Sequence, residues 1–206
     1  MLVRDVTAER LHRRIKKREL FKQFLLNPKQ VGTVFPSSPW LVKAMTRAIA
    51  SGLNPLQIAA SPLVLELGAG TGVITQNLLA MGLPPQNLYV VEINPILADE
   101  LKRLYPTINV IVGDARNLAQ ILPTELRGSF DFTISSLPLK NFDAEFRSQF
   151  IESVFAIMNN NGKVFQYSYF FSNPLKLNDK TVESRAVKQV WLNFPPATVW
   201  QYFRAR

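Results

Sequence analysis

The chain has 206 residues, 47% of them hydrophobic, which is enough for one α/β domain with a substantial core. It has no cysteine, which excludes disulfides and Cys-based metal sites, and its single histidine, His12, disfavours a His-ligated metal or a Ser-His-Asp triad. No stretch approaches the roughly 18–20 apolar residues of a membrane-spanning helix, and charges from Arg4 onward disfavour a secretory signal. We therefore expect a cytoplasmic protein without a metal site.

The formal net charge of +9 is unevenly distributed along the chain. Residues 1–30 carry nine Lys or Arg and three acidic residues, whereas residues 31–206 carry fifteen and twelve. The basic character is a local feature of the N-terminus, and it predicts a polyanionic surface as a partner.

Residues 6–26 contain neither Gly nor Pro and predict a basic amphipathic helix. Such a helix is typical of a membrane-surface element, in which each Lys or Arg near an anionic leaflet contributes about 1 kcal/mol. Two other interpretations stay open: a solvated helix packed on its own domain, and an arm that binds RNA phosphates. The membrane interpretation assigns lipid contact to five cations, Arg13, Arg14, Lys16, Lys17 and Arg18.

The helix is expected to end at Asn27–Gly32, where Pro and Gly punctuate the chain. A second helix is predicted over residues 40–50, with Ser38 as its N-cap and Pro39 at its first position. We interpret residues 1–52 as an N-terminal helical extension of a single domain whose ligand-binding core spans residues 60–206.

The central motif begins with the apolar run Leu63–Leu67, which predicts a buried parallel strand. Gly68, Gly70 and Gly72 follow, and a helix is predicted over 73–81. Glycine permits a sharp turn and the close approach of a ligand to the backbone, and the helix N-terminus offers free N–H groups. The motif indicates a nucleotide-cofactor site.

Strands and helices alternate over most of the remaining chain, which predicts an α/β protein with a mostly parallel sheet covered on both faces. The segment 159–162 is expected to form a turn. Residues 186–194 and 198–203 are expected to form a terminal antiparallel pair. The other predicted strands are 88–92, 108–112, 130–135 and 163–169, and the other predicted helices are 95–104 and 143–158.

Three acidic residues lie near the carboxyl ends of successive predicted strands, where ligands bind in parallel sheets. Glu66 is two residues before the first glycine, Glu92 closes the second strand about twenty residues after the turn, and Asp114 follows the third. Three acids disfavour a phosphate-rich cofactor. They favour S-adenosylmethionine, which presents an ammonium, a sulfonium, a ribose diol and an adenine amino group.

On these motifs, residues 63–140 resemble the class I S-adenosylmethionine-dependent methyltransferases. The resemblance implies a Rossmann-like, seven-stranded sheet with a C-terminal antiparallel hairpin. It also implies that the three glycines surround the methionine and ribose, that Glu92 binds the ribose hydroxyls and that Glu66 approaches the methionine amino group. The adenine would be bound by Asp114 and the backbone of Ala115, and Ser135 would complete the cofactor site.

The acceptor is indicated by the loop after the fourth strand. Adenine N-methyltransferases carry an amide or acid, then Pro and an aromatic there, whereas this chain has Ser136-Leu137-Pro138-Leu139. That loop is similar to the bacterial phospholipid N-methyltransferases, and so are Asn27–Gly32 with Pro36-Ser37-Ser38 and the segment Val190–Trp200. The resemblance implies methylation of phosphatidylethanolamine towards phosphatidylcholine by a peripheral enzyme on the inner face of the cytoplasmic membrane.

The amine acceptor must lose a proton before it attacks. The base could be a pocket Tyr or Asp, or water. Tyr167 and Tyr169 are candidates, although Tyr169 is equally a core aromatic, and Ser136 is a further candidate in the acceptor loop. Lys140 and Arg185 are candidates to meet a lipid phosphate or are simply solvated. Two alternatives stay open: a relative of the rRNA adenine N6-dimethyltransferases, and a non-catalytic cofactor-binding module at the membrane. No stable nucleic-acid partner is expected, and the sequence does not indicate an oligomeric state.

Overall fold

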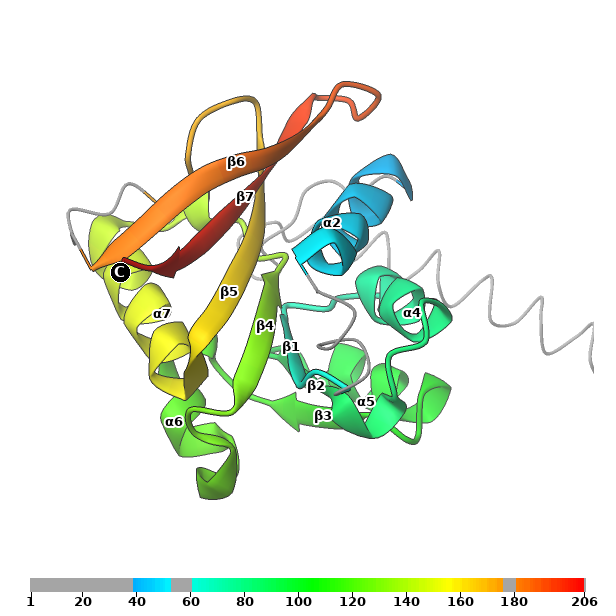
Figure 1. Ribbon diagram of the computed structural model, residues 1–206. Helices are drawn as coiled ribbons and strands as arrows, with labels where there is room; N and C mark the ends of the chain where they lie inside the picture. Colours follow the sequence, from blue (N-terminus) through cyan, green and yellow to red (C-terminus); the bar gives the residue numbers. More distant parts are fainter. Residues whose placement is uncertain (1–38, 53–60, 176–180, 206) are drawn as a thin grey trace, which may run out of the picture. The chain divides into compact units, whose positions relative to one another are not determined.

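A seven-stranded sheet in the order β3-β2-β1-β4-β5-β7-β6 forms the centre of the fold (Figure 1). Strands β1 to β5 pair in parallel, and β7 pairs antiparallel with both β5 and β6. The predicted Rossmann-like fold with a C-terminal antiparallel hairpin is therefore confirmed. The strands are β1 (Val64–Leu67), β2 (Leu88–Glu92), β3 (Asn109–Val112), β4 (Phe130–Ser135), β5 (Met158–Tyr169), β6 (Val182–Val190) and β7 (Ala197–Arg204).

The computed structural model describes residues 39–52, 61–175 and 181–205, all within the unit 37–206. The expected helix over 6–26 with its five lipid-contact cations, and the segments 27–32 and 36–38, lie outside the described residues. The helices are α2 (Pro39–Gly52), α4 (Val73–Ala80), α5 (Pro95–Leu104), α6 (Leu118–Ile121) and α7 (Ala144–Ile157). Short 3-10 turns are η1 (Pro85–Asn87), η2 (Ala115–Asn117), η3 (Thr124–Leu126) and η4 (Leu139–Asn141).

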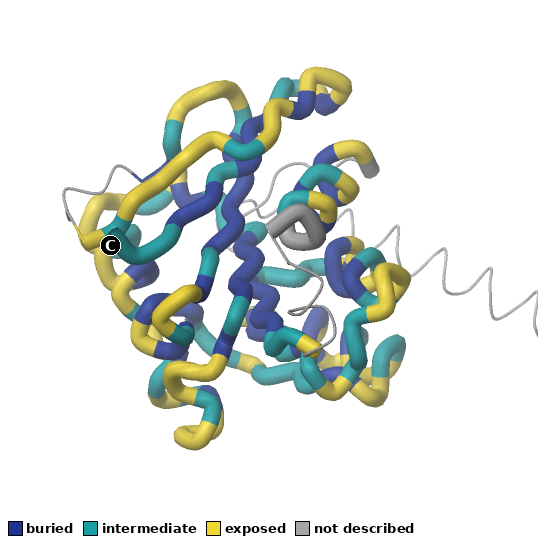
Figure 2. Tube along the Cα trace, in the orientation of Figure 1, coloured by how far each residue is buried: buried dark blue, intermediate teal, exposed yellow. Residues whose placement is uncertain are grey.

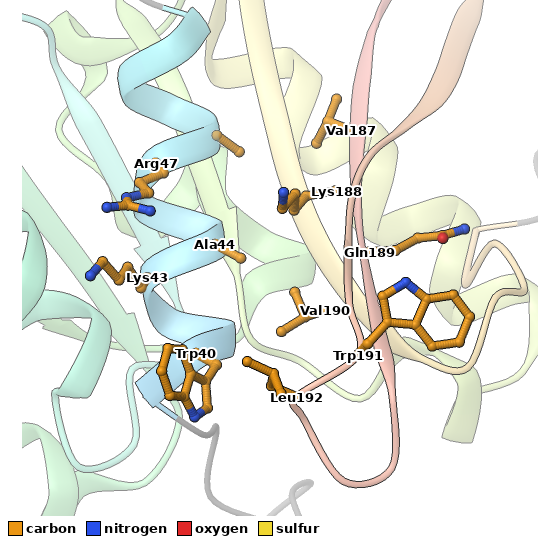
Figure 3. A pocket seen from close by; sticks show the side chains of 11 residues that line it. Trp40, Lys43, Ala44, Arg47, Val187, Lys188, Gln189, Val190, Trp191 and Leu192 are labelled. Atoms are coloured by element: carbon orange, nitrogen blue, oxygen red, sulfur yellow. The ribbon is translucent and has the colours of Figure 1, made fainter.

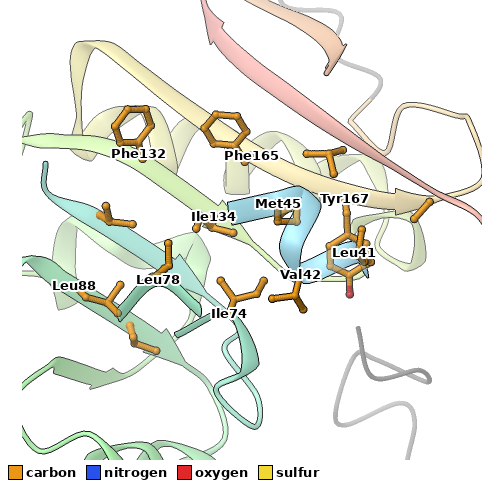
Figure 4. Packing of buried hydrophobic residues seen from close by; sticks show 14 of the residues in the cluster. Leu41, Val42, Met45, Ile74, Leu78, Leu88, Phe132, Ile134, Phe165 and Tyr167 are labelled. Carbon is orange, nitrogen blue, oxygen red and sulfur yellow. The ribbon is translucent and has the colours of Figure 1, made fainter. Parts of the chain in front are cut away.

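Helices cover both faces of the sheet, and each face has its own apolar cluster. Helices α2, α4 and α5 supply Leu41, Met45, Ile74, Leu78 and Leu101 to one cluster, together with strand residues such as Phe132 and Phe165 (Figure 4). Helix α7 dominates the other face through Phe150, Ile151, Val154 and Phe155. Helix α2, which the sequence placed in an extension, thus contributes directly to the core.

The central strands are buried on both faces, as the continuous apolar run of β1 predicts. Figure 2 shows this as a dark column through the middle of the molecule, whereas β6, the last strand of the sheet, is mostly exposed. Because these strands run in parallel, their carboxyl ends lie at one edge of the sheet.

Two predicted boundaries are wrong. The expected turn at 159–162 lies within β5 and forms a bulge, since Phe130 faces Met158 while Phe132 faces Lys163. The side-chain amide of Asn159 stabilises this bulge. Its Nδ2 donates to Asp131 Oδ1 (2.8 Å), and its Oδ1 accepts from the Asn161 N–H (3.0 Å). Side chain–backbone bonds that favour a turn in isolation here stabilise a bulge.

The hairpin also differs from its predicted bounds. Strand β6 begins at Val182 rather than at residue 186 and ends at Val190, which pairs with Ala197. The residues between them form the connection, because Pro195 and Pro196 have no N–H to donate to a ladder. Trp191, Leu192 and Phe194 therefore lie at the hairpin tip instead of within a strand.

Candidate active site

The register of the parallel strands brings the predicted cofactor residues to one edge of the sheet. Leu67, at the end of β1, faces Val91 of β2 on one side and Ser135 of β4 on the other. Glu92 faces Val112, directly before the Gly113-Asp114 turn. Residues from four separate stretches thus border one site at the carboxyl edge, where ligands bind in open α/β sheets.

The three glycines of the turn all have positive φ but serve different purposes. A Cβ on Gly68 would lie 2.7 Å from Leu137 Cδ2, and one on Gly72 would lie 2.7 Å from Leu101 Cδ2. A Cβ on Gly70 would meet no atom of the described residues within 4 Å. A side chain at position 68 or 72 would therefore collide with its neighbours, so packing requires glycine there. At Gly70 the missing side chain leaves the backbone accessible, and a ligand can approach it closely.

Glu92 is buried at the end of β2, and both of its carboxylate oxygens accept backbone hydrogen bonds. Oε2 accepts from the Gly70 N–H (2.9 Å) and Oε1 from the Asn94 N–H (3.0 Å). A carboxylate offers about four lone-pair sites, so each oxygen retains capacity for a ribose hydroxyl. Glu92 also fixes the glycine turn, a role that the sequence did not reveal.

Glu66 is fully buried beside the glycine turn, and only one of its two carboxylate oxygens has a hydrogen-bond partner among the described residues. Oε2 accepts a 2.6 Å hydrogen bond from the Thr75 hydroxyl, whereas no described residue donates to Oε1. Burial raises the pKa of Glu66 to about 7, the Thr75 hydrogen bonds oppose the shift, and the charge of Glu92 adds to it. A buried acceptor oxygen without a partner is costly, and the ammonium of a methionine group would satisfy it.

Asp114 caps the 3-10 turn η2 and is engaged by a neighbour that the prediction did not consider. Its Oδ1 accepts from the Arg116 N–H (2.9 Å), and its Oδ2 lies 2.6 Å from Arg116 Nη2. The Arg116 hydrogen bonds lower the pKa of Asp114, which is therefore ionised at neutral pH. The adjacent Ala115 is buried. An adenine amino group that bound Asp114 would share the carboxylate with the Arg116 guanidinium.

The acceptor loop follows β4 and is held from both sides. The Ser136 N–H donates to Leu67 O (3.0 Å), and the buried Ser135 hydroxyl accepts from the Leu137 N–H (3.3 Å). Gln166 of β5 donates from Nε2 to Leu137 O (3.0 Å) and to Tyr167 O (2.6 Å). Gln166 was not predicted as a site residue. Its only local signal is a polar residue between the aromatic residues Phe165 and Tyr167 of a predicted strand.

Tyr167 and Tyr169 lie on the same face of β5, with ring centroids 5.7 Å apart in an edge-to-face arrangement. Tyr167 is buried beside Leu41 and Val42 of α2 (Figure 4). Burial raises the pKa of Tyr169, with smaller contributions from Tyr167. Both residues belong to β5, which Gln166 ties to the acceptor loop, and we call this part of the site the acceptor side. The raised pKa of Tyr169 disfavours a phenolate base at neutral pH.

The two candidate phosphate ligands are placed differently. Lys140 lies directly after the acceptor loop and donates from Nζ to Tyr169 O (2.7 Å), at the carboxyl end of β5. Arg185 lies near the beginning of β6, donates to Gln201 Oε1 (2.7 Å) and stacks over Phe203. Gln201 faces Phe165, four residues before Tyr169. The structure thus brings Lys140, and not Arg185, to the acceptor side.

The fold and this arrangement of acids around a glycine turn define a class I methyltransferase, and comparison with known proteins agrees. A family model described as a methyltransferase domain matches residues 64–162. The ornithine lipid N-methyltransferase of Singulisphaera acidiphila is 31% identical over 143 residues, which cover 68% of this chain and 71% of that protein. The chain belongs to the class I S-adenosylmethionine-dependent methyltransferases, and the predicted resemblance to bacterial lipid N-methyltransferases is confirmed by this relative.

Solved structures share the fold at low sequence identity. The Burkholderia thailandensis 1,6-didemethyltoxoflavin N1-methyltransferase, crystallised with S-adenosylhomocysteine, superposes with a TM-score of 0.65 at 10% identity and covers 93% of this chain and 90% of its own. A TehB-like methyltransferase from Corynebacterium glutamicum has a TM-score of 0.59 at 15% identity, covering 91% and 97%. Membership of the family makes S-adenosylmethionine the cofactor, and the unsatisfied Glu66 oxygen and the open backbone at Gly70 fit it.

Among the described residues, no helix has the length and apolar character that crossing a bilayer requires.

Proposed function

We propose that this protein methylates a primary amine in a lipid headgroup, with phosphatidylethanolamine as the expected substrate. The observation that carries the proposal is the acceptor loop, in which Ser136-Leu137-Pro138-Leu139 provides neither an amide nor an aromatic ring for a nucleobase. The ornithine lipid N-methyltransferase relative supports a lipid acceptor. Ornithine lipids and phosphatidylethanolamine both carry a primary amine, so both belong in the test.

S-adenosylmethionine supplies, when bound, a methyl group that is already a strong electrophile. The protein's contribution is then to orient the amine and to exclude water. The fixed acceptor loop supports this role, because Gln166 and Ser135 hold it against β5 and β4. The neutral hydroxyls of Tyr167 and Tyr169 would accept hydrogen bonds from the amine and orient its lone pair, while solvent takes the proton.

Lys140 would bind the lipid phosphate next to the reacting amine. Its Nζ already donates to Tyr169 O, which leaves donors for an anionic oxygen. Burial lowers the pKa of Lys140, and an approaching phosphate would oppose this shift and favour the ammonium. A cation directly after the acceptor loop would select phospholipids that present an amine beyond a phosphate.

We further propose that the enzyme works as a peripheral protein on an anionic membrane, with lipid contact by the five cations of the segment 6–26. This proposal rests on the sequence pattern of that segment. The competing functions are methylation of rRNA adenine and a non-catalytic module. The missing nucleobase-binding residues of the acceptor loop favour the lipid over the RNA.

The test is to incubate the full chain with radiolabelled S-adenosylmethionine and, separately, phosphatidylethanolamine vesicles, ornithine lipid vesicles and ribosomal RNA. We expect label in phosphatidylethanolamine, with the products identified by mass spectrometry. Label in ornithine lipid alone would revise the headgroup, and label in RNA alone would refute the lipid assignment. Label in none of the three, from protein that binds S-adenosylhomocysteine, would favour the module.

A further inference from the structure

Large apolar side chains gather on the surface at the tip of the β6–β7 hairpin. Trp191, Leu192 and Phe194 in the tip are 64%, 71% and 95% exposed, and Phe170 and Phe171, directly after β5, are exposed as well. We call these five residues the tip surface. Clustered exposed aromatic residues are rare in soluble proteins and mark binding surfaces.

The tip surface is held by hydrogen bonds and is not a loose loop. The Phe170 N–H donates to Pro196 O (2.7 Å), and the Thr198 hydroxyl donates to Phe170 O (3.0 Å). The rings of Phe171 and Trp191 pack with their centroids 4.9 Å apart. Within the part of the chain that the structure describes, this framework therefore holds the aromatic side chains exposed on the surface.

Cations lie on one side of the tip surface, and the described segments that form it and line this side carry no acid. A groove of about 480 Å³ runs between α2 and β6 beside the tip and is lined by Trp40, Leu192 and the cations Lys43, Arg47 and Lys188 (Figure 3). The segments 39–52, 168–175 and 186–204 contain no Asp or Glu. A surface of exposed tryptophan and other apolar side chains with Lys and Arg beside it is complementary to an anionic bilayer interface.

The tip surface also adjoins the acceptor side of the active site. Tyr169, the last residue of β5, pairs with Ala197, and Ala197 pairs with Val190 at the end of β6. Lys140, directly after the acceptor loop, donates to Tyr169 O. A bilayer that received the tip would therefore lie at the edge of the sheet where the amine has to enter.

We propose that the tip surface inserts into the headgroup region of an anionic bilayer and so sets the acceptor side against the membrane. This inference deepens the proposed function and rests on it for the choice of lipid as partner. It differs from the contact proposed for residues 6–26, because it lies in the folded core and fixes an orientation. Single-stranded RNA, whose bases stack on aromatic rings, is the competing occupant.

The first experiment places Trp191 relative to the bilayer in the full chain. The double variant Trp40→Phe/Trp200→Phe leaves Trp191 as the only tryptophan. It is mixed with vesicles of phosphatidylglycerol and phosphatidylcholine brominated on its acyl chains. We expect quenching and a blue shift of Trp191 emission. Vesicle-bound protein with unquenched Trp191, or quenching by oligouridine but not by lipid, would overturn the proposal.

The second experiment measures vesicle partition by flotation. Leu192→Ser/Phe194→Ser removes apolar contact from two exposed positions, and we expect the partition coefficient to fall roughly tenfold or more. Lys188→Ala should lower it roughly fivefold. Met81→Ser is the matched control, because Met81 is also exposed and ends α4, which runs back from the cofactor edge. Equal partition of Leu192→Ser/Phe194→Ser and Met81→Ser would refute the tip contact.

These measurements use vesicles without a methyl acceptor, so their outcome does not depend on catalysis. Methylation of phosphatidylethanolamine dispersed in detergent tests the proposed function without a bilayer. We expect Leu192→Ser/Phe194→Ser to retain detergent activity and to lose activity on vesicles. If this variant lost activity both in detergent and on vesicles but still bound vesicles as well as the wild type, the result would count against the tip as a membrane contact.

Discussion

The backbone N–H of Gly70 donates a 2.9 Å hydrogen bond to Glu92 Oε2, and this bond ties the turn after β1 to the end of β2. The residue expected to bind the ribose is thus also the residue that shapes the glycine turn. Removal of the Glu92 side chain would both delete a ligand contact and release the turn that presents Gly70 to the cofactor.

We therefore expect Glu92→Ala to weaken binding of S-adenosylhomocysteine by about 10- to 100-fold, since a hydrogen bond to a charged group contributes about 1.5–3 kcal/mol. Isothermal titration calorimetry measures the dissociation constant. Glu100→Ala is the matched control, because Glu100 is an acid on α5 that pairs with Arg103. Equal affinities of the two variants would remove Glu92 from the cofactor site.

Ligand binding should release protons from Glu66 near neutral pH. The carboxyl group has a pKa of about 7 without ligand, and an ammonium at its unsatisfied oxygen favours the ionised form. At pH 7 we expect release of about half a proton per S-adenosylhomocysteine bound, and none at pH 8.5. Calorimetry in two buffers of different ionisation enthalpy measures this number. Glu66→Gln should bind weakly and release none.

The same group makes the ligand-free fold less stable as pH rises. Glu66 titrates near pH 7 when folded and near 4.5 when unfolded, so the folded state binds more protons between these values. The contribution of Glu66 to the free energy of unfolding is fully present below about pH 4.5. It is lost as the pH rises to about 7, and the loss is about 3 kcal/mol. We expect Glu66→Gln to be more stable than wild type at pH 8 and nearly equal at pH 4.5. Urea unfolding at both pH values tests the sign.

Two glycines of one turn should respond differently to alanine. A left-handed conformation costs a non-glycine residue roughly 1–2 kcal/mol, and both Gly70 and Gly72 incur this cost. Gly72→Ala adds a 2.7 Å contact with Leu101 Cδ2, so it should lower the free energy of unfolding more. Gly70→Ala should instead weaken cofactor binding more. Urea unfolding and calorimetry on both variants give the comparison, and the reverse ranking would contradict the assignment of Gly70 to the ligand.

Gln166 should affect the lipid reaction without affecting cofactor affinity. Gln166→Leu removes both donors to Leu137 O and Tyr167 O, and an unsatisfied buried carbonyl costs about 1–3 kcal/mol. We expect at least about a tenfold fall in kcat/KM for the lipid amine, with an unchanged dissociation constant for S-adenosylhomocysteine. Gln149→Leu, on the exposed face of α7, is the control. A matched loss of cofactor affinity would show that Gln166 supports the whole edge instead.

Much of the site was predictable, because its residues follow from strand ends. The apolar run before Gly68, and the position of Glu92 and Asp114 at the ends of later strands, place these residues at one edge of any parallel sheet. The pairing of Asp114 with Arg116 was visible as an acid two residues before a base, but only the 3-10 turn brings the two side chains together.

Other features depend on contacts between distant residues, which local sequence patterns do not specify. The Gly70–Glu92 bond joins residues 22 positions apart, and the Gln166–Leu137 bond joins residues 29 apart. Asn159–Gly162 has the composition of a turn, yet Asp131 of the neighbouring strand captures the Asn159 amide. In each case the structure depends on a tertiary partner, and at Asn159 that partner overrides the local preference.

The shift of register in β6 bears on aggregation through the exposed edge of the sheet. The register of β6 against β7 shifts between Ala186 and Lys188, in the strand that closes one side of the sheet. A bulge bends such a strand and breaks up the row of N–H and C=O groups that another chain would need for pairing. Arg185 and Lys188 add charge along the same strand. The outer side of the sheet is thereby protected against edge-to-edge aggregation.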